Sequence, residues 1–136
     1  MASPDPIIDG IVLAYVRAWN EPDTAQRRAL LAKSVTEDVY VTYPTVDLRG
    51  REALIGYIEE SMKQRPGRRF VLISGVHQHR DRIRYGWALV QGDGTTLVEA
   101  TDVGELDPDS RLQRVTGFYG PPPPPPESWP REAVTR

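Results

Sequence analysis

The N-terminal part of the chain repeats its apolar positions with the period of an α-helix. Ile8, Ile11, Tyr15 and Trp19 recur every three to four residues, as along the buried face of a helix. The run Asn20-Glu21-Pro22-Asp23 breaks this pattern and is expected to end the helix. The sequence therefore predicts a largely buried first helix.

Two more helices are predicted before residue 70. Asp23, followed three positions later by Gln26, has the spacing of an N-terminal capping box and predicts a short helix that runs through Leu30 and Leu31. A third helix is expected between Gly50 and the Pro66-Gly67 pair. Its apolar positions, which again fit a period of 3.6 residues, are Leu54, Tyr57, Ile58 and Met62.

The remaining segments up to residue 120 have the alternating pattern of strands. Residues 35–48 are expected to be extended, with a break at Pro44. Four strands follow, separated by short turns, at residues 70–78, 83–91, 95–106 and 112–120. This order predicts an α+β fold in which three N-terminal helices pack on one face of a strongly curved, mostly antiparallel sheet. A pocket is expected between the first helix and the concave face.

The composition changes at Gly120. Residues 1–120 are expected to form one domain, and residues 121–136 a proline-rich tail. The six consecutive prolines from Pro121 to Pro126 predict a polyproline II rod of about 19 Å. Trp129 is the only large apolar side chain beyond them, so the tail is either a solvated end or a rod that carries Trp129 to a groove or a partner subunit.

Composition and charge exclude several classes of protein. The 136 residues contain 19 acidic and 17 basic side chains, for a net charge of −2, so no nucleic-acid partner is expected. The absence of cysteine excludes disulfides, a thiolate nucleophile and cysteine-based zinc sites. No apolar stretch approaches the length of a membrane span and no signal peptide is evident, so we expect no membrane association and a cytoplasmic location.

Asp102 is the first candidate for chemistry. Period-two alternation places it on the same strand face as Val98, Ala100 and Gly104, which are small or apolar. A carboxyl that points into an apolar cavity resists ionisation, so Asp102 is a candidate hydrogen-bond donor or general acid. The alternative is an aspartate bonded to the backbone or to an arginine at a strand edge.

Aromatic residues and histidines supply the other candidates. Tyr15 and Trp19 lie one turn apart on the first helix, and together with Trp87 they are either core residues or the walls of a cavity into which the Tyr15 hydroxyl projects. His77 and His79 face the same side of a strand, but two ligands without an identifiable third are a weak metal signal. No metal or other cofactor is therefore expected.

Several segments together resemble one family. They are the 14–20 segment Ala-Tyr-Val-Arg-Ala-Trp-Asn, the stretch ending at Tyr43-Pro44, the helix start at 48–54, and Thr101-Asp102 followed by residues 106–112. Their order and spacing over residues 7–120 resemble the NTF2-like superfamily, in its SnoaL-like polyketide cyclase and ketosteroid isomerase branch. The resemblance implies a cone-shaped domain, an apolar pocket and a homodimer formed through the outer sheet face.

The resemblance also assigns roles to residues. Tyr15 falls where ketosteroid isomerase has its oxyanion-hole tyrosine, and Asp102 falls where that enzyme has an aspartic acid that its apolar surroundings keep protonated. Tyr43 stands where the isomerase has its general base, which puts the usual steroid isomerisation in doubt. The substitute base is open among His79, Asp47 and the substrate itself. The expected pocket lining is Trp19, Tyr43, Tyr57, Trp87, Ala100, Val115 and Tyr119.

Three functions are compatible with these residues. The first is an isomerase, cyclase or hydratase that acts on a small apolar carbonyl compound, with Tyr15 and Asp102 donating hydrogen bonds to an oxygen that gains negative charge. His79 is included as a candidate catalytic residue because a proton acceptor is needed. The second is a binding protein for a small apolar ligand, and the third is a dimeric interaction domain.

Overall fold

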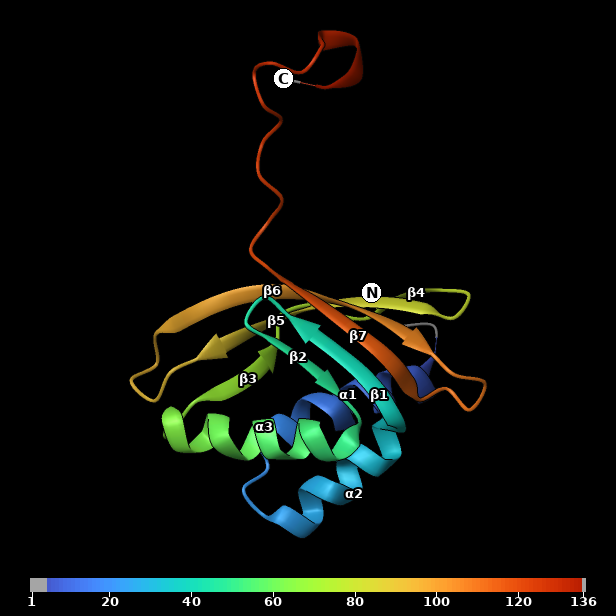
Figure 1. The fold of residues 1–136 in the computed structure, drawn as a ribbon, viewed down its shortest axis with the longest axis vertical. Coiled ribbons are helices and arrows are strands. Elements are labelled where there is room, and N and C mark those ends of the chain that lie inside the picture. The colour runs from blue at the N-terminus through green and yellow to red at the C-terminus, as the bar shows by residue number, and fades with distance from the viewer. Residues whose placement is uncertain (1–4, 136) are drawn as a thin grey trace.

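The computed structural model describes residues 5–135 as three helices packed against one face of a curved seven-stranded sheet (Figure 1). This confirms the predicted α+β class. The elements in chain order are α1 (Pro6–Asn20), α2 (Thr24–Ser34), β1 (Val35–Tyr43), β2 (Val46–Arg49), α3 (Arg51–Gln64), β3 (Arg69–Leu72), β4 (His77–His79), β5 (Arg82–Val90), β6 (Thr96–Leu106), β7 (Leu112–Tyr119) and a short 3-10 helix η1 (Arg131–Ala133).

The first two helices begin at aspartate caps. The Asp5 carboxylate accepts hydrogen bonds from the backbone N–H of Ile7 at 2.9 Å and of Ile8 at 3.3 Å. Asp23 caps α2 by accepting from the N–H of Gln26 at 2.8 Å. In a capping box, the side chain of Gln26 would accept a hydrogen bond from the Asp23 N–H. In the structure this N–H donates instead to the Glu21 carboxylate at 3.2 Å.

The sheet has the order β2-β1-β7-β6-β5-β3, with β4 also paired to β5. Strands β5, β6 and β7 form the predicted antiparallel meander. The strand predicted at 70–78 is instead two short strands, because between them Ile73 and Ser74 bond the backbone of Gly86 rather than continuing the ladder. The extended stretch at 35–48 is a hairpin whose first strand, β1, pairs in parallel with β7.

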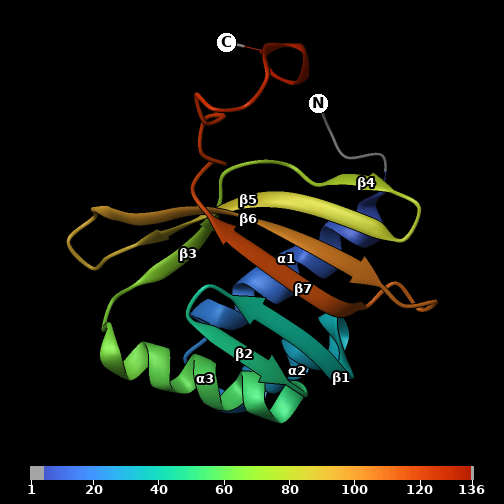
Figure 2. The same cartoon turned by 45° about the horizontal axis from the view of Figure 1, so that its top comes forward.

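The concave face of the sheet and the helices enclose the core. Helix α1 lies beneath β5, β6 and β7 in both views (Figure 1 and Figure 2). Along β6, Ala100, Asp102 and Gly104 are buried, whereas Thr101 and Val103 are exposed on the outer face. The predicted alternation therefore holds in the structure, and Asp102 points inward.

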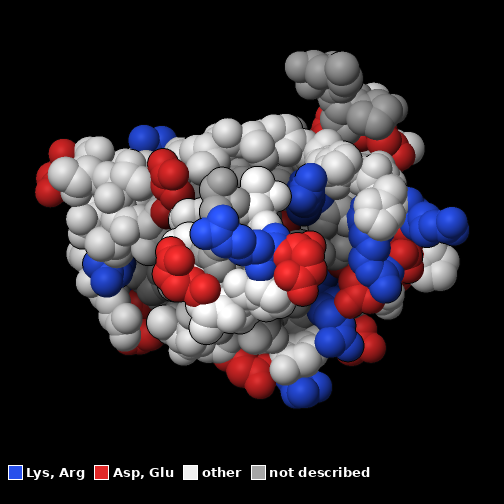
Figure 3. Space-filling view, turned by 90° about the horizontal axis from the view of Figure 1, so that it is seen from above, with Lys and Arg blue, Asp and Glu red and all other residues white. Residues whose placement is uncertain are grey.

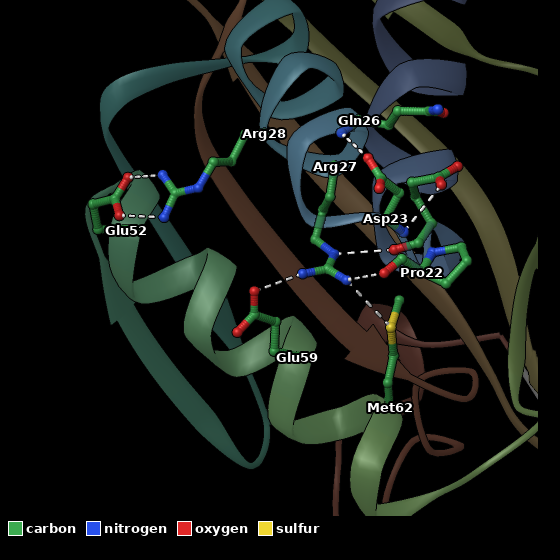
Figure 4. Close-up of polar contacts among 9 residues, drawn as sticks. Pro22, Asp23, Gln26, Arg27, Arg28, Glu52, Glu59 and Met62 are labelled. Carbon is green, nitrogen blue, oxygen red and sulfur yellow. Dashed lines mark hydrogen bonds and ion pairs between the residues drawn. The ribbon is translucent and has the colours of Figure 1, made fainter.

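Arg27 joins α2 to α3 from a buried position, as Figure 4 shows. Its guanidinium donates to the Glu59 carboxylate at 2.8 Å and to the carbonyl oxygens of Glu21 at 3.1 Å and Pro22 at 3.3 Å. A guanidinium with its hydrogens in use at several fixed acceptors is the arrangement in which an arginine tolerates burial. This contact holds α3, which forms one wall of the site described below.

The chain leaves the sheet after β7. Residues 121–133 are exposed and run away from the domain as an extended segment that ends near η1 (Figure 1 and Figure 2). Trp129 is exposed. Among the residues that the structure describes, none of the helices combines the length and the apolar character needed to cross a bilayer.

Gly117 makes room for a contact between β1 and β6. It is the register partner of Asp102, and a Cβ built on it would overlap the Tyr43 ring and lie 2.8 Å from the Asp102 carboxylate. Only a residue without a Cβ leaves Tyr43 space to lie over β7 and approach Asp102.

We therefore expect Gly117→Ala to lower the free energy of unfolding by about 1–3 kcal/mol, the usual cost of overpacking a core. The matched control is Gly10→Ala in α1, where a Cβ meets no atom within 4 Å, and which should be neutral or stabilising because alanine favours helix. Urea denaturation measures both. Equal stability of Gly117→Ala and the wild type would contradict this account of Gly117.

Candidate active site

A cavity of about 390 Å³ lies between α1, the C-terminal half of α3 and the concave face of the sheet. Its walls are mainly aromatic, with the side chains of Tyr15, Trp19, Tyr43, Tyr57, Phe70, Trp87 and Tyr119. A polar rim surrounds one side and consists of Thr45, Glu60, Ser61, Gln64 and Arg65. Asp102 also lines the cavity, so a buried acidic group lies among its aromatic walls.

Two of the residues expected in the lining are not there. Val115 is fully buried in the hydrophobic core, in register with Gly104 of β6 and Val41 of β1, and does not line the cavity. Ala100 faces inward as predicted, but it lies between its two register partners, Trp87 and Tyr119. These two rings lie 6.2 Å apart in an edge-to-face arrangement and form the wall in its place.

His79 is not part of this site. It lies exposed on β4, paired with Arg82, and is not among the residues that line the cavity. Strand β4 pairs only with β5, which places the histidine on the outer side of the sheet's edge, away from Tyr15 and Asp102. The neighbouring His77 accepts a hydrogen bond from Arg84 at 3.0 Å. Within residues 5–135, no cluster of three His, Cys, Asp or Glu side chains could hold a metal ion.

The Asp102 carboxylate is the centre of a buried hydrogen-bond network. Only 1% of the residue is exposed. One oxygen, Oδ2, accepts from the Tyr85 hydroxyl at 2.9 Å and from the Tyr43 hydroxyl at 3.1 Å. The other, Oδ1, accepts from the Trp87 indole N–H at 2.8 Å. The partners are therefore phenols and an indole, not the backbone or arginine partner of the alternative interpretation.

Tyr15 extends this network by one residue. Its hydroxyl oxygen lies 2.9 Å from that of Tyr43, so Tyr15, Tyr43 and Asp102 form a line of three hydrogen-bonding groups. All three line the cavity, and they come from α1, β1 and β6. The predicted candidates Tyr15 and Asp102 are thus brought together, with Tyr43 as the bridge between them.

Burial shifts the acidities of these groups. It raises the pKa of Asp102 to about 6, because desolvation of the charge outweighs the stabilising hydrogen bonds from Trp87, Tyr85 and Tyr43. The upward shift agrees with the sequence analysis, but at pH 7 the carboxylate is largely ionised rather than protonated. Burial, and then the charge of Asp102, also raise the pKa values of Tyr15, Tyr43 and Tyr85, so the phenols keep their protons.

The protonation state of Asp102 decides which group donates in each hydrogen bond along the line of Tyr15, Tyr43 and Asp102. When the carboxylate is charged, Tyr43 must donate to it, so the Tyr43 oxygen can accept from Tyr15. When Asp102 is protonated, it can donate to Tyr43, Tyr43 to Tyr15, and Tyr15 into the cavity. The same three groups therefore present an acceptor to a ligand in one state and a donor in the other.

Aromatic rings hold these hydroxyls in place. The Trp19 ring makes edge-to-face contacts with Tyr15 at 6.4 Å, Tyr43 at 6.0 Å and Phe70 at 5.2 Å between centroids. Trp87 contacts Tyr43 at 6.0 Å and Phe70 at 5.3 Å in the same manner. The two tryptophans thus serve as cavity walls as well as core residues.

Sequence reasoning missed part of the site. Tyr85 alternates in register with Trp87, and that spacing already placed it on the inner face, but not against Asp102. Phe70 begins a strand and gave no signal of its own. The polar rim follows Tyr57 along α3 at the spacing of one helix face, which could have identified Ser61 and Gln64.

No family model matches the chain, and no curated protein matches it by sequence. Among solved structures, a SnoaL-like family protein of Agrobacterium tumefaciens, described as a candidate isomerase, is 32% identical, with a TM-score of 0.76 over 82% of this chain and 95% of that one.

Two more distant structures share the fold. A SnoaL-like protein of unknown function from Burkholderia thailandensis is 17% identical, with a TM-score of 0.68 over 88% of this chain and 99% of its own. A candidate SnoaL-like polyketide cyclase from Jannaschia is also 17% identical, with a TM-score of 0.63 over 88% of this chain and 91% of its own.

The raised pKa of Asp102 predicts a dependence of stability on pH. The folded protein binds this proton more tightly than the unfolded chain, whose aspartate has the ordinary pKa of 3.8. The contribution of Asp102 to the free energy of unfolding therefore increases as the pH falls through about 6. Relative to Asp102→Asn, the wild type should gain about 1 kcal/mol between pH 7 and pH 5.

Urea denaturation of both proteins at the two pH values measures this difference, in which the contributions of the other carboxyl groups cancel. A difference that stays constant, or that shrinks toward pH 5, would contradict a raised pKa of Asp102 in the folded protein.

Proposed function

Because the chain belongs to the SnoaL-like family of NTF2-like proteins, we propose that it is an enzyme that isomerises or cyclises an apolar carbonyl compound in this cavity. The observation that carries the proposal is the line Tyr15, Tyr43 and Asp102, which sets a carboxylate and two phenols against an aromatic wall. Its Agrobacterium relative, a candidate isomerase, supports the same class of reaction.

The first step is removal of a proton from the carbon next to the carbonyl group. The C–H bond breaks, its proton joins the Asp102 carboxylate, and its electron pair forms the double bond of an enolate whose charge lies on the carbonyl oxygen. A carboxylate with a pKa of about 6 is both ionised at pH 7 and a stronger base than an ordinary aspartate. Asp102 then supplies the proton acceptor that Tyr43 cannot.

The second part of the mechanism is stabilisation of the enolate. Once Asp102 holds the proton, it can donate to Tyr43 and Tyr43 to Tyr15, which leaves the Tyr15 hydrogen for the charged oxygen. Return of the proton to a different carbon completes an isomerisation. Attack of the enolate carbon on a second carbonyl group, with the proton passing to the new alkoxide, completes a cyclisation.

The other candidate bases are less well placed, and Glu60, the second carboxylate in the cavity lining, is exposed at the rim. Asp47 is exposed on β2 and His79 is exposed on β4, and neither lines the site. Tyr43 keeps its proton because burial and the charge of Asp102 raise its pKa. Asp102 is therefore the acidic group best placed for the transfer.

Proton exchange tests this function without knowledge of the natural product. In deuterium oxide at neutral pD, the protein should accelerate exchange of the α-protons of the fused-ring ketones α-tetralone and β-tetralone, followed by nuclear magnetic resonance. Asp102→Asn should reduce the rate by about 10²-fold or more, and Tyr15→Phe by a smaller factor.

His79→Asn is the matched control, since this exposed histidine is outside the cavity, and it should exchange at the wild-type rate. If both ketones bind but exchange no faster than in buffer, the site is a binding pocket and the enzyme proposal fails.

We also propose that a second copy of the chain covers the outer face of the sheet. Exposed apolar side chains gather there at Phe118, Val103 and Ile73, which are 63%, 40% and 51% exposed. On the same face, Glu105 bonds Arg114 at 3.0 Å and lies 3.4 Å from Arg82, which reduces repulsion between copies. Figure 3 shows acidic and basic side chains interspersed over this side, with no field of one sign.

Phe118→Asp should convert the dimer to a monomer, because it places a charge at the centre of the apolar contact. Ile7→Asp is the matched control, since Ile7 is equally exposed but lies on α1, and it should remain dimeric. Light scattering after size-exclusion chromatography distinguishes the two masses. A wild-type protein that elutes as a monomer would refute the dimer.

A further inference from the structure

A buried cation lies behind the part of the cavity wall that Trp19, Ser61 and Phe70 form. Arg68, in the loop between α3 and β3, is only 6% exposed. Its Nε donates to the Ser61 hydroxyl oxygen at 3.0 Å, one terminal nitrogen donates to the carbonyl oxygen of Trp19, and the guanidinium lies 4.8 Å from the centre of the Phe70 ring. The three residues that it touches all line the cavity.

This charge is not neutralised by the protein. Within residues 5–135, Arg68 forms no ion pair with a carboxylate, and its second terminal nitrogen has no hydrogen-bond partner. The buried Arg27, by contrast, is paired with Glu59 at 2.8 Å. Burial and then the charge of Arg27 lower the pKa of Arg68 to about 10, so it remains charged at neutral pH. A buried cation without a counter-ion costs stability, which favours a role beyond packing.

The hydrogen bond from Arg68 to Ser61 orients the serine hydroxyl. Because the serine oxygen accepts from Arg68, the hydroxyl keeps its own hydrogen for a group in the cavity. Four residues after Ser61, at the C-cap of α3, the exposed Arg65 lines the rim. Glu60 is the acidic group on the same rim, and it accepts a hydrogen bond from Gln64 at 3.4 Å. The wall formed by Ser61 and Arg65 is therefore rich in donors and cationic.

We propose that this wall is a subsite for a carboxylate group of the substrate. The Ser61 hydroxyl donates to one carboxylate oxygen, Arg65 approaches from the rim, and Arg68 supplies positive charge from behind. The inference rests on the proposed function for the position of the reacting end, which lies at Tyr15 and Asp102. The substrate is then an apolar, ring-containing compound with a carbonyl group at one end and a carboxylate at the other.

A matched pair of probes tests the subsite. Isothermal titration calorimetry at pH 7.5 compares 6-hydroxy-2-naphthoic acid, which is charged, with its uncharged methyl ester. We expect the acid to bind about ten-fold more tightly, the usual effect of one hydrogen bond to a charged group. Ser61→Ala should reduce that preference to about two-fold, and Arg65→Gln should reduce it in part.

Two further variants separate the possible outcomes. Arg68 itself is not replaced, because loss of this buried side chain endangers folding. The control is Lys63→Gln, which removes a cation from the same turn of α3 but outside the cavity lining, and it should keep the full preference for the acid. Tyr15→Phe should weaken both probes equally. If acid and ester bind equally while Tyr15→Phe still weakens both, the cavity stands and the carboxylate subsite is refuted. If neither probe binds while the tetralones still exchange, the carboxylate subsite is refuted and the proposed function stands.

Discussion

The burial of one carboxylate organises this protein. An ionised group that is 1% exposed is stable only if donors replace the water it has lost, and Asp102 receives three, from Tyr43, Tyr85 and Trp87. Each donor has an aromatic body, so the hydrogen bonds that satisfy the charge also build an apolar wall around it. The compensation is incomplete, and the pKa therefore remains raised, at about 6. A carboxyl of this kind can both lose and take up a proton near neutral pH.

Several distant features of the fold serve this arrangement. The parallel pairing of β1 with β7 brings Tyr43 alongside the strand next to Asp102, and Gly117 leaves the space in which the tyrosine ring lies. Helix α1 places Tyr15 on the far side of Tyr43. Because the three groups come from three elements, the geometry of the line depends on how the helices are held against the sheet.

Two arginines, one on α2 and one in the loop after α3, are also buried, and their surroundings differ. Arg27 is fully bonded and fixes α2 to α3, whereas Arg68 lacks a counter-ion and lies behind the serine that faces the cavity. A cavity with a carboxylate in one wall and a cation behind another wall has a defined direction, from a negative side to a positive side. A ligand that is apolar in the middle and polar at both ends matches that direction better than a uniformly apolar one.

The sequence by itself determined the local features: the three helices, the meander, and the inward direction of Asp102 and Tyr15. Side-chain periodicity fixes which face of an element is apolar, and that information is contained within a few neighbouring residues. Only the tertiary structure decided which faces meet. Asp102 bonds Tyr43 across 59 positions of the chain, and Arg68 reaches the carbonyl of Trp19 across 49. The tertiary structure also decided that His79 lies away from the site and that aromatic rings cover Ala100. The sequence could not show this, because strand pairing and packing between elements leave no periodic signal in the chain.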